Sequence, residues 1–120
     1  MPATDKRESA VSYASYKRLK FERRGRILTV TMNRPEVLNA IEAVLHEELA
    51  RVFYDVAEDP EADVIVLTGA GKAFSAGGDI NWMQEMIDDK AKWERTRTEA
   101  KKIVFGLLDS HTQLGISSVR

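Results

Sequence analysis

The stretch TGAGKAFSAGGDI at residues 68–80 decides how the rest of the chain is interpreted. Small residues dominate it, and Asp79 is a preferred residue type for the position just before a helix. Small residues let a ligand approach the main chain closely, and the first N–H groups of a helix lack partners within that helix. Such donors, at the positive end of the helix dipole, can hold an oxygen that gains negative charge. The alternative interpretation is a loop with a purely structural role.

Two phosphate-binding motifs do not fit this stretch. A P-loop would need glycine where Val66 stands, and serine or threonine where Ala73 follows Lys72. A dinucleotide-binding fingerprint that starts at Gly69 would need glycine in place of Phe74. Neither motif therefore predicts nucleotide binding here.

The residues before this stretch predict a hairpin, a helix and a buried strand, in that order. Two runs rich in apolar and β-branched residues flank Gly25, which predicts a β-hairpin over residues 19–32. Apolar residues recur every three or four positions from 39 to 58, which is typical of a helix with one buried face. The apolar run 64–68 predicts a strand that is buried on both faces. Strand, helix and strand in succession predict a right-handed crossover and a parallel strand pair, so the expected fold class is α/β.

The residues after the stretch predict two more helices. The first begins near Ile80. Its apolar side consists of Met83, Met86 and Ile87. The second is expected over residues 91–109. Its expected buried stripe includes Ala100, Ile103, Val104, Leu107 and Leu108. Residues 1–18 are expected to form a flexible N-terminal tail, and residues 110–120 an irregular C-terminal one.

Composition limits the classes of function. With 120 residues, 43% apolar and 31% charged, the chain fits one globular domain. Eighteen basic and 19 acidic residues nearly cancel, so no global attraction to nucleic acid or anionic membranes is expected. The absence of cysteine excludes disulfides, thiolate catalysis and a cysteine-ligated metal site. No apolar run approaches the roughly 20 residues of a membrane span, and residues 1–18 contain no apolar signal core. A cytoplasmic location is therefore expected.

Other charged residues have mainly structural interpretations. Basic residues cluster from 17 to 26, but Glu22 interrupts them and strand alternation predicts solvated side chains, so nucleic acid is not an expected partner. His46 and His111 have no partner at metal-ligand spacing, so both are expected to be solvated and no metal site is predicted. The carboxylates between residues 85 and 99 are interpreted mostly as a solvated helix face.

Three motifs resemble, in the same order, those of the crotonase superfamily, the enoyl-CoA hydratase/isomerase family. GKAFSAGGDI at 71–80 resembles the family's first oxyanion-hole motif. NRP at 33–35 followed by LNA at 38–40 resembles the turn between its hairpin and first helix, and residues 63–69 resemble the strand before the oxyanion loop. The resemblance implies that residues 19–109 are the N-terminal part of a ClpP/crotonase-like spiral fold, incomplete in this chain.

The resemblance also assigns site residues one by one. Gly78 would donate a backbone N–H to the thioester oxygen and is the candidate catalytic residue. Ala76 would contact the adenine end of coenzyme A through its backbone, and Ala40 lies in a segment that helps to form the coenzyme A surface. The full set expected to bind the coenzyme A substrate is Ala40, Ala76, Gly77, Asp79 and Ile80.

Asp79 and Ile80 would continue the loop into the helix that lines the acyl pocket. Asp79 is interpreted as a helix cap in preference to a catalytic base. Met83, Met86 and Trp82 are candidates for lining that pocket, because methionine adapts to irregular apolar shapes. Ordinary core packing is the alternative for these three side chains.

The implied function is that of an acyl-CoA-binding enzyme that stabilises a thioester enolate, above all an enoyl-CoA hydratase. Coenzyme A is then part of the substrate, no prosthetic group is expected, and a full-length parent is expected to form a homotrimer or hexamer. The alternatives are enoyl-CoA isomerase or another crotonase activity, or an acyl-CoA-binding chain without catalysis.

In the family, a second oxyanion donor and the catalytic carboxylates come from later segments, and no acidic residue follows Asp109. No strand–loop–helix unit is predicted there either. A truncated or misread C-terminus is therefore expected, and the 120 residues alone are not expected to turn over enoyl-CoA. A natural acyl-CoA-binding remnant and an unrelated α/β interaction domain are the alternatives.

Overall fold

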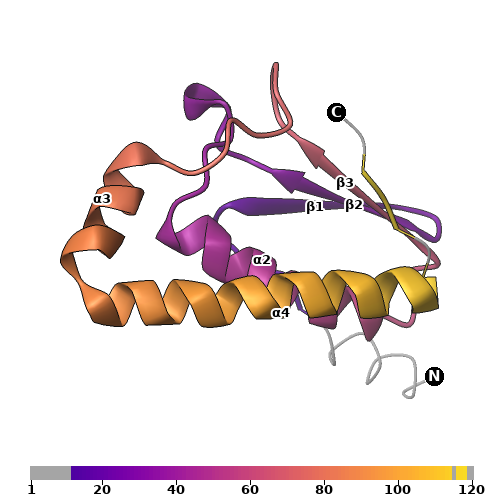
Figure 1. The fold of residues 1–120 in the computed structure, drawn as a ribbon. Helices are drawn as coiled ribbons and strands as arrows, with labels where there is room; N and C mark the ends of the chain where they lie inside the picture. The colour runs from indigo at the N-terminus through magenta and orange to yellow at the C-terminus, as the bar shows by residue number, and fades with distance from the viewer. Residues whose placement is uncertain (1–11, 115, 119–120) are drawn as a thin grey trace.

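The computed structural model describes residues 12–114 and 116–118, with side chains up to residue 110. One sheet contains four strands in the order β1 (Leu19–Arg24), β2 (Ile27–Met32), β3 (Val64–Gly69) and β4 (Ile116–Ser118). The helices are α2 (Ala43–Ala57), α3 (Ile80–Asp88) and α4 (Lys90–Leu114). Helices α2 and α4 lie on one side of the sheet, with α4 packed along α2, and α3 projects beyond the end of the sheet (Figure 1). The α/β class is thus confirmed.

Strands β1 and β2 form the expected hairpin. They pair antiparallel, with Leu19 opposite Met32 and Arg24 opposite Ile27. Gly25 adopts a φ of +60° in the two-residue turn between them, a conformation that glycine reaches at little cost. Alternate residues of β2 point into the core, namely Leu28, Val30 and Met32.

Strand β3 pairs in parallel with β2, from Ile27 opposite Val64 to Met32 opposite Gly69, which confirms the predicted parallel pair. The expected burial on both faces is not observed. Ile65 is 1% exposed, whereas Val64 on the other face is 39% exposed. The described helices cover only one side of the sheet, so alternate residues of β3 remain accessible (Figure 1).

The irregular tail expected over residues 110–120 is wrong for the described part of that range. Helix α4 continues to Leu114, and β4 then pairs in parallel with β3, with Ile65 opposite Ile116. No proline or glycine stands between Asp109 and Gly115 to end the helix. A three-residue strand is also too short to show alternation in the sequence, and it is formed here by pairing with the edge of β3.

Helix α2 begins at Ala43, four residues later than the predicted start at residue 39. Leu38 and Asn39 both have left-handed backbone conformations, with φ of 55° and 56°, which an α-helix cannot contain. A single 3-10 turn, η1 (Pro35–Val37), precedes them. The side chain of Glu42 caps α2 by accepting the N–H of Leu45 at 2.7 Å.

The core lies between the sheet and α2. Each large apolar side chain that is removed from water there contributes about 1.5–3 kcal/mol. The largest fully buried apolar residues are Leu28, Val30, Met32, Leu45, Val52, Val56 and Ile65.

Helix α4 packs on α2 through a face that was not predicted. Of the expected stripe only Ile103 packs against the core, while Val104 is 54% exposed. The less exposed residues recur at helical spacing and are mostly small or polar, namely Thr96, Glu99, Ile103, Gly106 and Ser110. Gly106 lies against Phe53 and Tyr54 of α2, and the Ser110 hydroxyl donates to the Phe53 carbonyl. Close approach of two helices favours small residues, so the bulkier apolar side chains face outward.

The flexible tail expected over residues 1–18 is wrong from residue 12 onward, and residues 1–11 lie outside the described part. Tyr16 belongs to the core, and its hydroxyl donates to Asp55. The Tyr13 ring stacks on Phe21, and its hydroxyl donates to Asp59 at 2.7 Å. These aromatic contacts order the segment before β1. No helix in the described residues is both long and apolar enough to cross a membrane.

Candidate functional site

The candidate site lies where the loop after β3 enters α3. The Asp79 carboxylate accepts the N–H of Asn81 at 2.9 Å and that of Trp82 at 3.2 Å. Asp79 is therefore the N-cap of α3, as predicted. Gly78 stands directly before this cap, at the predicted junction of loop and helix.

The turn before α2 pairs with this loop like a short parallel strand. Leu38 accepts the N–H of Ala76 at 2.9 Å. Ile41 donates to the Gly77 carbonyl at 2.7 Å and accepts the N–H of Asp79 at 2.7 Å, which forms a parallel bridge centred on Gly78. The structure thus brings together two segments that are more than thirty residues apart in the sequence.

The pairing fixes the direction of the Gly78 N–H. In a planar trans peptide the C=O and the following N–H point in opposite directions. Because the Gly77 carbonyl points at Ile41, the Gly78 N–H points away from that segment. It has no hydrogen-bond partner within the described part of the chain, and Gly78 is exposed. This N–H is available to an oxygen of a ligand.

Asn39 joins the turn to the loop, a role that the sequence did not reveal. It is fully buried, and its side-chain oxygen accepts the N–H of Arg34 at 2.8 Å. Its amide nitrogen donates to the carbonyls of Ala70 at 2.9 Å and Ala73 at 2.8 Å. The only sequence signal was the residue type, since asparagine tolerates the left-handed conformation observed here.

Gly69 permits this close contact. A Cβ atom at this position would lie 2.4 Å from the Phe74 carbonyl oxygen and 2.8 Å from the Asn39 amide nitrogen. Both distances are shorter than any side chain could tolerate. The glycine after the strand is therefore needed for packing, in addition to any turn that it allows.

Apolar side chains of α3 lie beside the Gly78 backbone. A Cβ atom built on Gly78 would be 3.4 Å from the Met83 sulfur and 3.8 Å from the Trp82 ring. Met83 also lines an apolar hollow of about 450 Å³ at the corner of α3 and α4, together with Met86, Ile87 and Trp93. The Trp82 ring lies next to His46, with ring centroids 5.1 Å apart. Two of the three predicted pocket residues, Met83 and Met86, thus line one hollow, whereas Trp82 lies beside Gly78 and His46 and does not line it.

The other predicted binding residues lie around this junction. Ala40 is adjacent to the paired segment, and its carbonyl accepts from the Arg34 guanidinium. The N–H of Ala76 is occupied by Leu38, so within the described residues only its carbonyl lacks a partner. Ile80 is the first residue of α3 and is 77% exposed. Backbone atoms, more than side chains, therefore define this surface.

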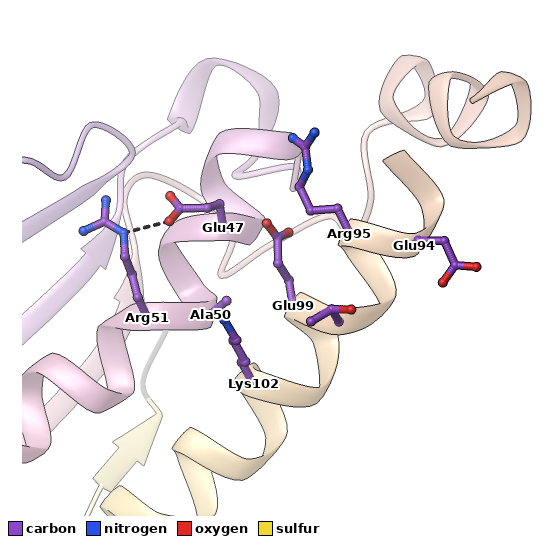
Figure 2. Close-up of a pocket in the computed structure, with 8 residues that line it drawn as sticks. Glu47, Ala50, Arg51, Glu94, Arg95, Glu99 and Lys102 are labelled. Carbon is purple, nitrogen blue, oxygen red and sulfur yellow. Dashed lines mark hydrogen bonds and ion pairs between the residues drawn. The ribbon is translucent and has the colours of Figure 1, made fainter. Parts of the chain in front are cut away.

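A larger hollow of about 510 Å³ lies elsewhere, in the groove between α2 and α4 (Figure 2). Its lining includes charges of both signs, from Glu47 and Arg51 on α2 and from Arg95, Glu99 and Lys102 on α4. None of residues 76–80 contributes to it. Glu47 and Arg51 neutralise each other at 2.9 Å, so this groove is an ordinary solvated junction of two helices.

The loop that carries Gly78 lies within a range that matches a known protein family. Residues 22–108 match the model of the enoyl-CoA hydratase/isomerase family. The chain belongs to this family. The matched range includes the second half of β1, all of β2, the turn at 38–41 and the loop that carries Gly78.

Three relatives show how far the similarity to the enoyl-CoA hydratase/isomerase family extends. A probable enoyl-CoA hydratase of Rhizobium meliloti (strain 1021) is 37% identical over 75% of this chain and 38% of its own length. A hydroxycinnamoyl-CoA hydratase-lyase of Pseudomonas fluorescens is 35% identical over 87% of this chain and 38% of its own length. The crystal structure of an enoyl-CoA hydratase/isomerase from Mycobacterium paratuberculosis superposes with a TM-score of 0.75 at 34% identity, over 84% of this chain and 39% of that one. The chain spans about two-fifths of the length of these relatives.

Two side chains of opposite helices, His46 and Glu99, form a largely buried pair that the sequence did not predict. His46 and Glu99 were expected to be solvated, but their side chains are 12% and 13% exposed and lie 2.8 Å apart between α2 and α4. The pairing of α2 with α4 was not visible in the sequence.

Among the described residues, no group of three acidic, histidine or cysteine side chains could hold a metal ion. His111 lies beyond the last described side chain.

Proposed function

We propose that this chain binds an acyl-CoA thioester and that the Gly78 N–H donates a hydrogen bond to the thioester carbonyl oxygen. The observation that carries the proposal is the unpaired, exposed Gly78 N–H, whose direction the Ile41 pairing fixes. A donor that is already oriented stabilises charge that develops on an oxygen without reorganisation, and one such donor typically contributes about 10²–10³ in rate.

The reaction class that the relatives favour is addition of water to a 2-enoyl-CoA. Two of the three relatives compared above are named as a probable enoyl-CoA hydratase and a hydroxycinnamoyl-CoA hydratase-lyase, and both names refer to CoA compounds. When a water oxygen bonds to C3 of an enoyl thioester, one water proton passes to a base and the C2–C3 π electron pair moves through C2 to the carbonyl oxygen, where the Gly78 N–H would donate to it. C2 then takes up a proton as the thioester carbonyl re-forms, which completes the addition of water. Isomerase or lyase chemistry passes through the same enolate and is the alternative.

The ligand is expected to lie across the two paired segments. The coenzyme A moiety would run along Ala40, Ala76 and Gly77, with Asp79 and Ile80 beside the thioester. The acyl chain would reach the apolar hollow at Met83, which is close to the Gly78 backbone. A cytoplasmic location, a trimeric or hexameric assembly and the lack of a prosthetic group belong to the same proposal.

The proposal can be tested by NMR because the chain has only seven glycines, so a sample labelled with ¹⁵N-glycine gives a sparse spectrum. Titration with butyryl-CoA should shift the Gly78 amide proton downfield. A thioether analogue, S-butyl-CoA, lacks the carbonyl oxygen and should leave that proton nearly unchanged while it still shifts Gly77. Equal responses to the two probes, or no binding of either, would refute the assignment of Gly78.

A further inference from the structure

The peptide plane between Gly77 and Gly78 can rotate at little conformational cost. Neither flanking residue has a Cβ atom, and Gly77 already adopts a φ of +97°. Rotation of this peptide by half a turn would point its carbonyl toward the ligand and its N–H toward Ile41. A carbonyl in that position would repel a thioester oxygen. The two glycines that let a ligand approach therefore also require a lock on their shared peptide.

The Ser75 hydroxyl is placed to supply that lock. It accepts the N–H of Gly77 at 3.1 Å and donates to the main-chain carbonyl of Asn39 at 2.8 Å. A serine hydroxyl has one donor and two acceptor positions, so both bonds can form together. The bond to Gly77 fixes the peptide that precedes the critical one, and the bond to Asn39 fixes the facing segment.

Asn39 makes the facing segment a firm support. Its side chain bonds Arg34 on its own turn and the carbonyls of Ala70 and Ala73 on the loop. These bonds keep the turn in register with the loop, so that the N–H of Ile41 meets the carbonyl of Gly77 at 2.7 Å. The direct hydrogen bond to the peptide and the serine bond beside it thus depend on one buried side chain.

We propose that Ser75, supported by Asn39, is a positioning residue that holds the Gly77–Gly78 peptide with its N–H toward the ligand. The inference rests on the proposed function in one respect, since it takes Gly78 as the donor to a thioester oxygen. Ser75 itself touches no reacting atom in this scheme, because its hydroxyl is already engaged by Gly77 and Asn39.

The first test needs no ligand. In the chain labelled with ¹⁵N-glycine, Ser75→Ala should speed hydrogen exchange at the Gly77 amide by about three- to tenfold, as expected for the loss of one hydrogen bond. Ser75→Thr keeps a hydroxyl and should restore the wild-type rate. Gly106 of α4 serves as an internal control for folding, and its amide should exchange equally in all three proteins. Unchanged exchange at Gly77 in Ser75→Ala would overturn the inference.

The second test separates positioning from stability. Ser75→Ala should lower the affinity for butyryl-CoA about three- to tenfold more than the affinity for S-butyl-CoA, because only the thioester accepts a hydrogen bond from the oriented N–H. Ser75→Thr should return the ratio of the two affinities to the wild-type value. A general loosening of the fold would weaken both probes alike, and that result would overturn the inference. If the wild-type protein itself does not distinguish the probes, the proposed function fails instead, and the exchange rate at Gly77 still decides whether Ser75 orders the loop.

Discussion

Glu48 is a buried carboxylate that fixes where the chain enters the sheet. It is 2% exposed, and it accepts the N–H groups of Lys17 at 2.7 Å, Arg18 at 2.9 Å and Leu19 at 3.1 Å. Hydrogen bonds to an ionised acceptor are stronger than neutral ones, and three of them offset the cost of burying the charge. This residue therefore holds the segment before β1 against α2.

Replacement of Glu48 should show how much this arrangement contributes. We expect Glu48→Ala to lower the free energy of unfolding by about 2–4 kcal/mol, because three N–H groups lose their acceptor. The matched control is Glu47→Ala, which removes an exposed ion pair with Arg51 and should cost less than about 1 kcal/mol. Urea denaturation followed by circular dichroism measures both. Similar losses in the two variants would contradict the role given to Glu48.

At the scale of elements, α4 shows that the apolar side of a helix is not always its buried side. The pattern of apolar residues in 91–109 predicted a buried stripe that included Val104, but the small residues pack on α2 instead. Gly106 decides this arrangement, because a Cβ atom there would lie 3.0 Å from the Tyr54 ring and 3.2 Å from the Phe53 Cβ. Contact between the two helices thus depends on the absence of a side chain.

A bulky side chain at this contact should separate the helices. Gly106→Leu is expected to destabilise the protein by about 1–3 kcal/mol, despite the better helix propensity of leucine, because the added atoms overlap α2. The control Val104→Lys changes an exposed position of the same helix and should stay within about 0.5 kcal/mol of wild type. Thermal unfolding of both variants gives the comparison. A larger loss in Val104→Lys would mean that the predicted stripe was correct after all.

The elements and the site differ in how much of them the sequence could predict. The hairpin and the cap at Asp79 follow from local residue patterns, and the parallel pair follows from the order strand, helix, strand; all three were predicted. The late start of α2 could not be predicted, because it depends on the left-handed pair at Leu38 and Asn39. That pair is stabilised by bonds to Ala70 and Ala73, more than thirty residues away. For the same reason, the loop that carries Gly78 was recognised, but its attachment to the turn was not.

At the scale of the whole molecule, one polar network ties the N-terminal segment, the hairpin and the end of α2 together. Asp59 accepts from Tyr13 and from the Arg23 guanidinium, both at 2.7 Å. Burial alone would raise the pKa of Asp59, but the hydrogen bonds from Arg23 and Tyr13 outweigh it and hold the pKa below 3.8. Burial and the bond to Asp59 raise the pKa of Tyr13 above its usual value of 10.0. Burial and the hydrogen bond to Asp55 likewise raise the pKa of Tyr16 above its usual value of 10.0.

These shifts predict stability that declines at both ends of the pH scale. A carboxyl whose pKa is lower in the folded state contributes stability that is complete above its unfolded pKa, near 3.8, and is lost as the pH falls through the folded value. A phenol whose pKa is raised on folding contributes stability that is complete below 10.0 and declines as the pH rises above it. We therefore expect a plateau between about pH 5 and pH 9.

The loss of stability at low pH and the loss at high pH can each be assigned to a residue by urea denaturation of single variants at a series of pH values. Asp59→Asn should be about 1–3 kcal/mol less stable than wild type on the plateau, because Arg23 and Tyr13 then donate to a neutral amide oxygen and no longer to a charged carboxylate. That difference should shrink below about pH 4, where the wild-type carboxyl also becomes protonated. Tyr16→Phe should differ from wild type least above pH 10, since the wild-type phenol is then losing its advantage. A difference between wild type and Asp59→Asn that stays constant from pH 7 to pH 2 would show that the network does not depend on the ionised carboxylate, and the account of how it joins the three segments would have to be abandoned.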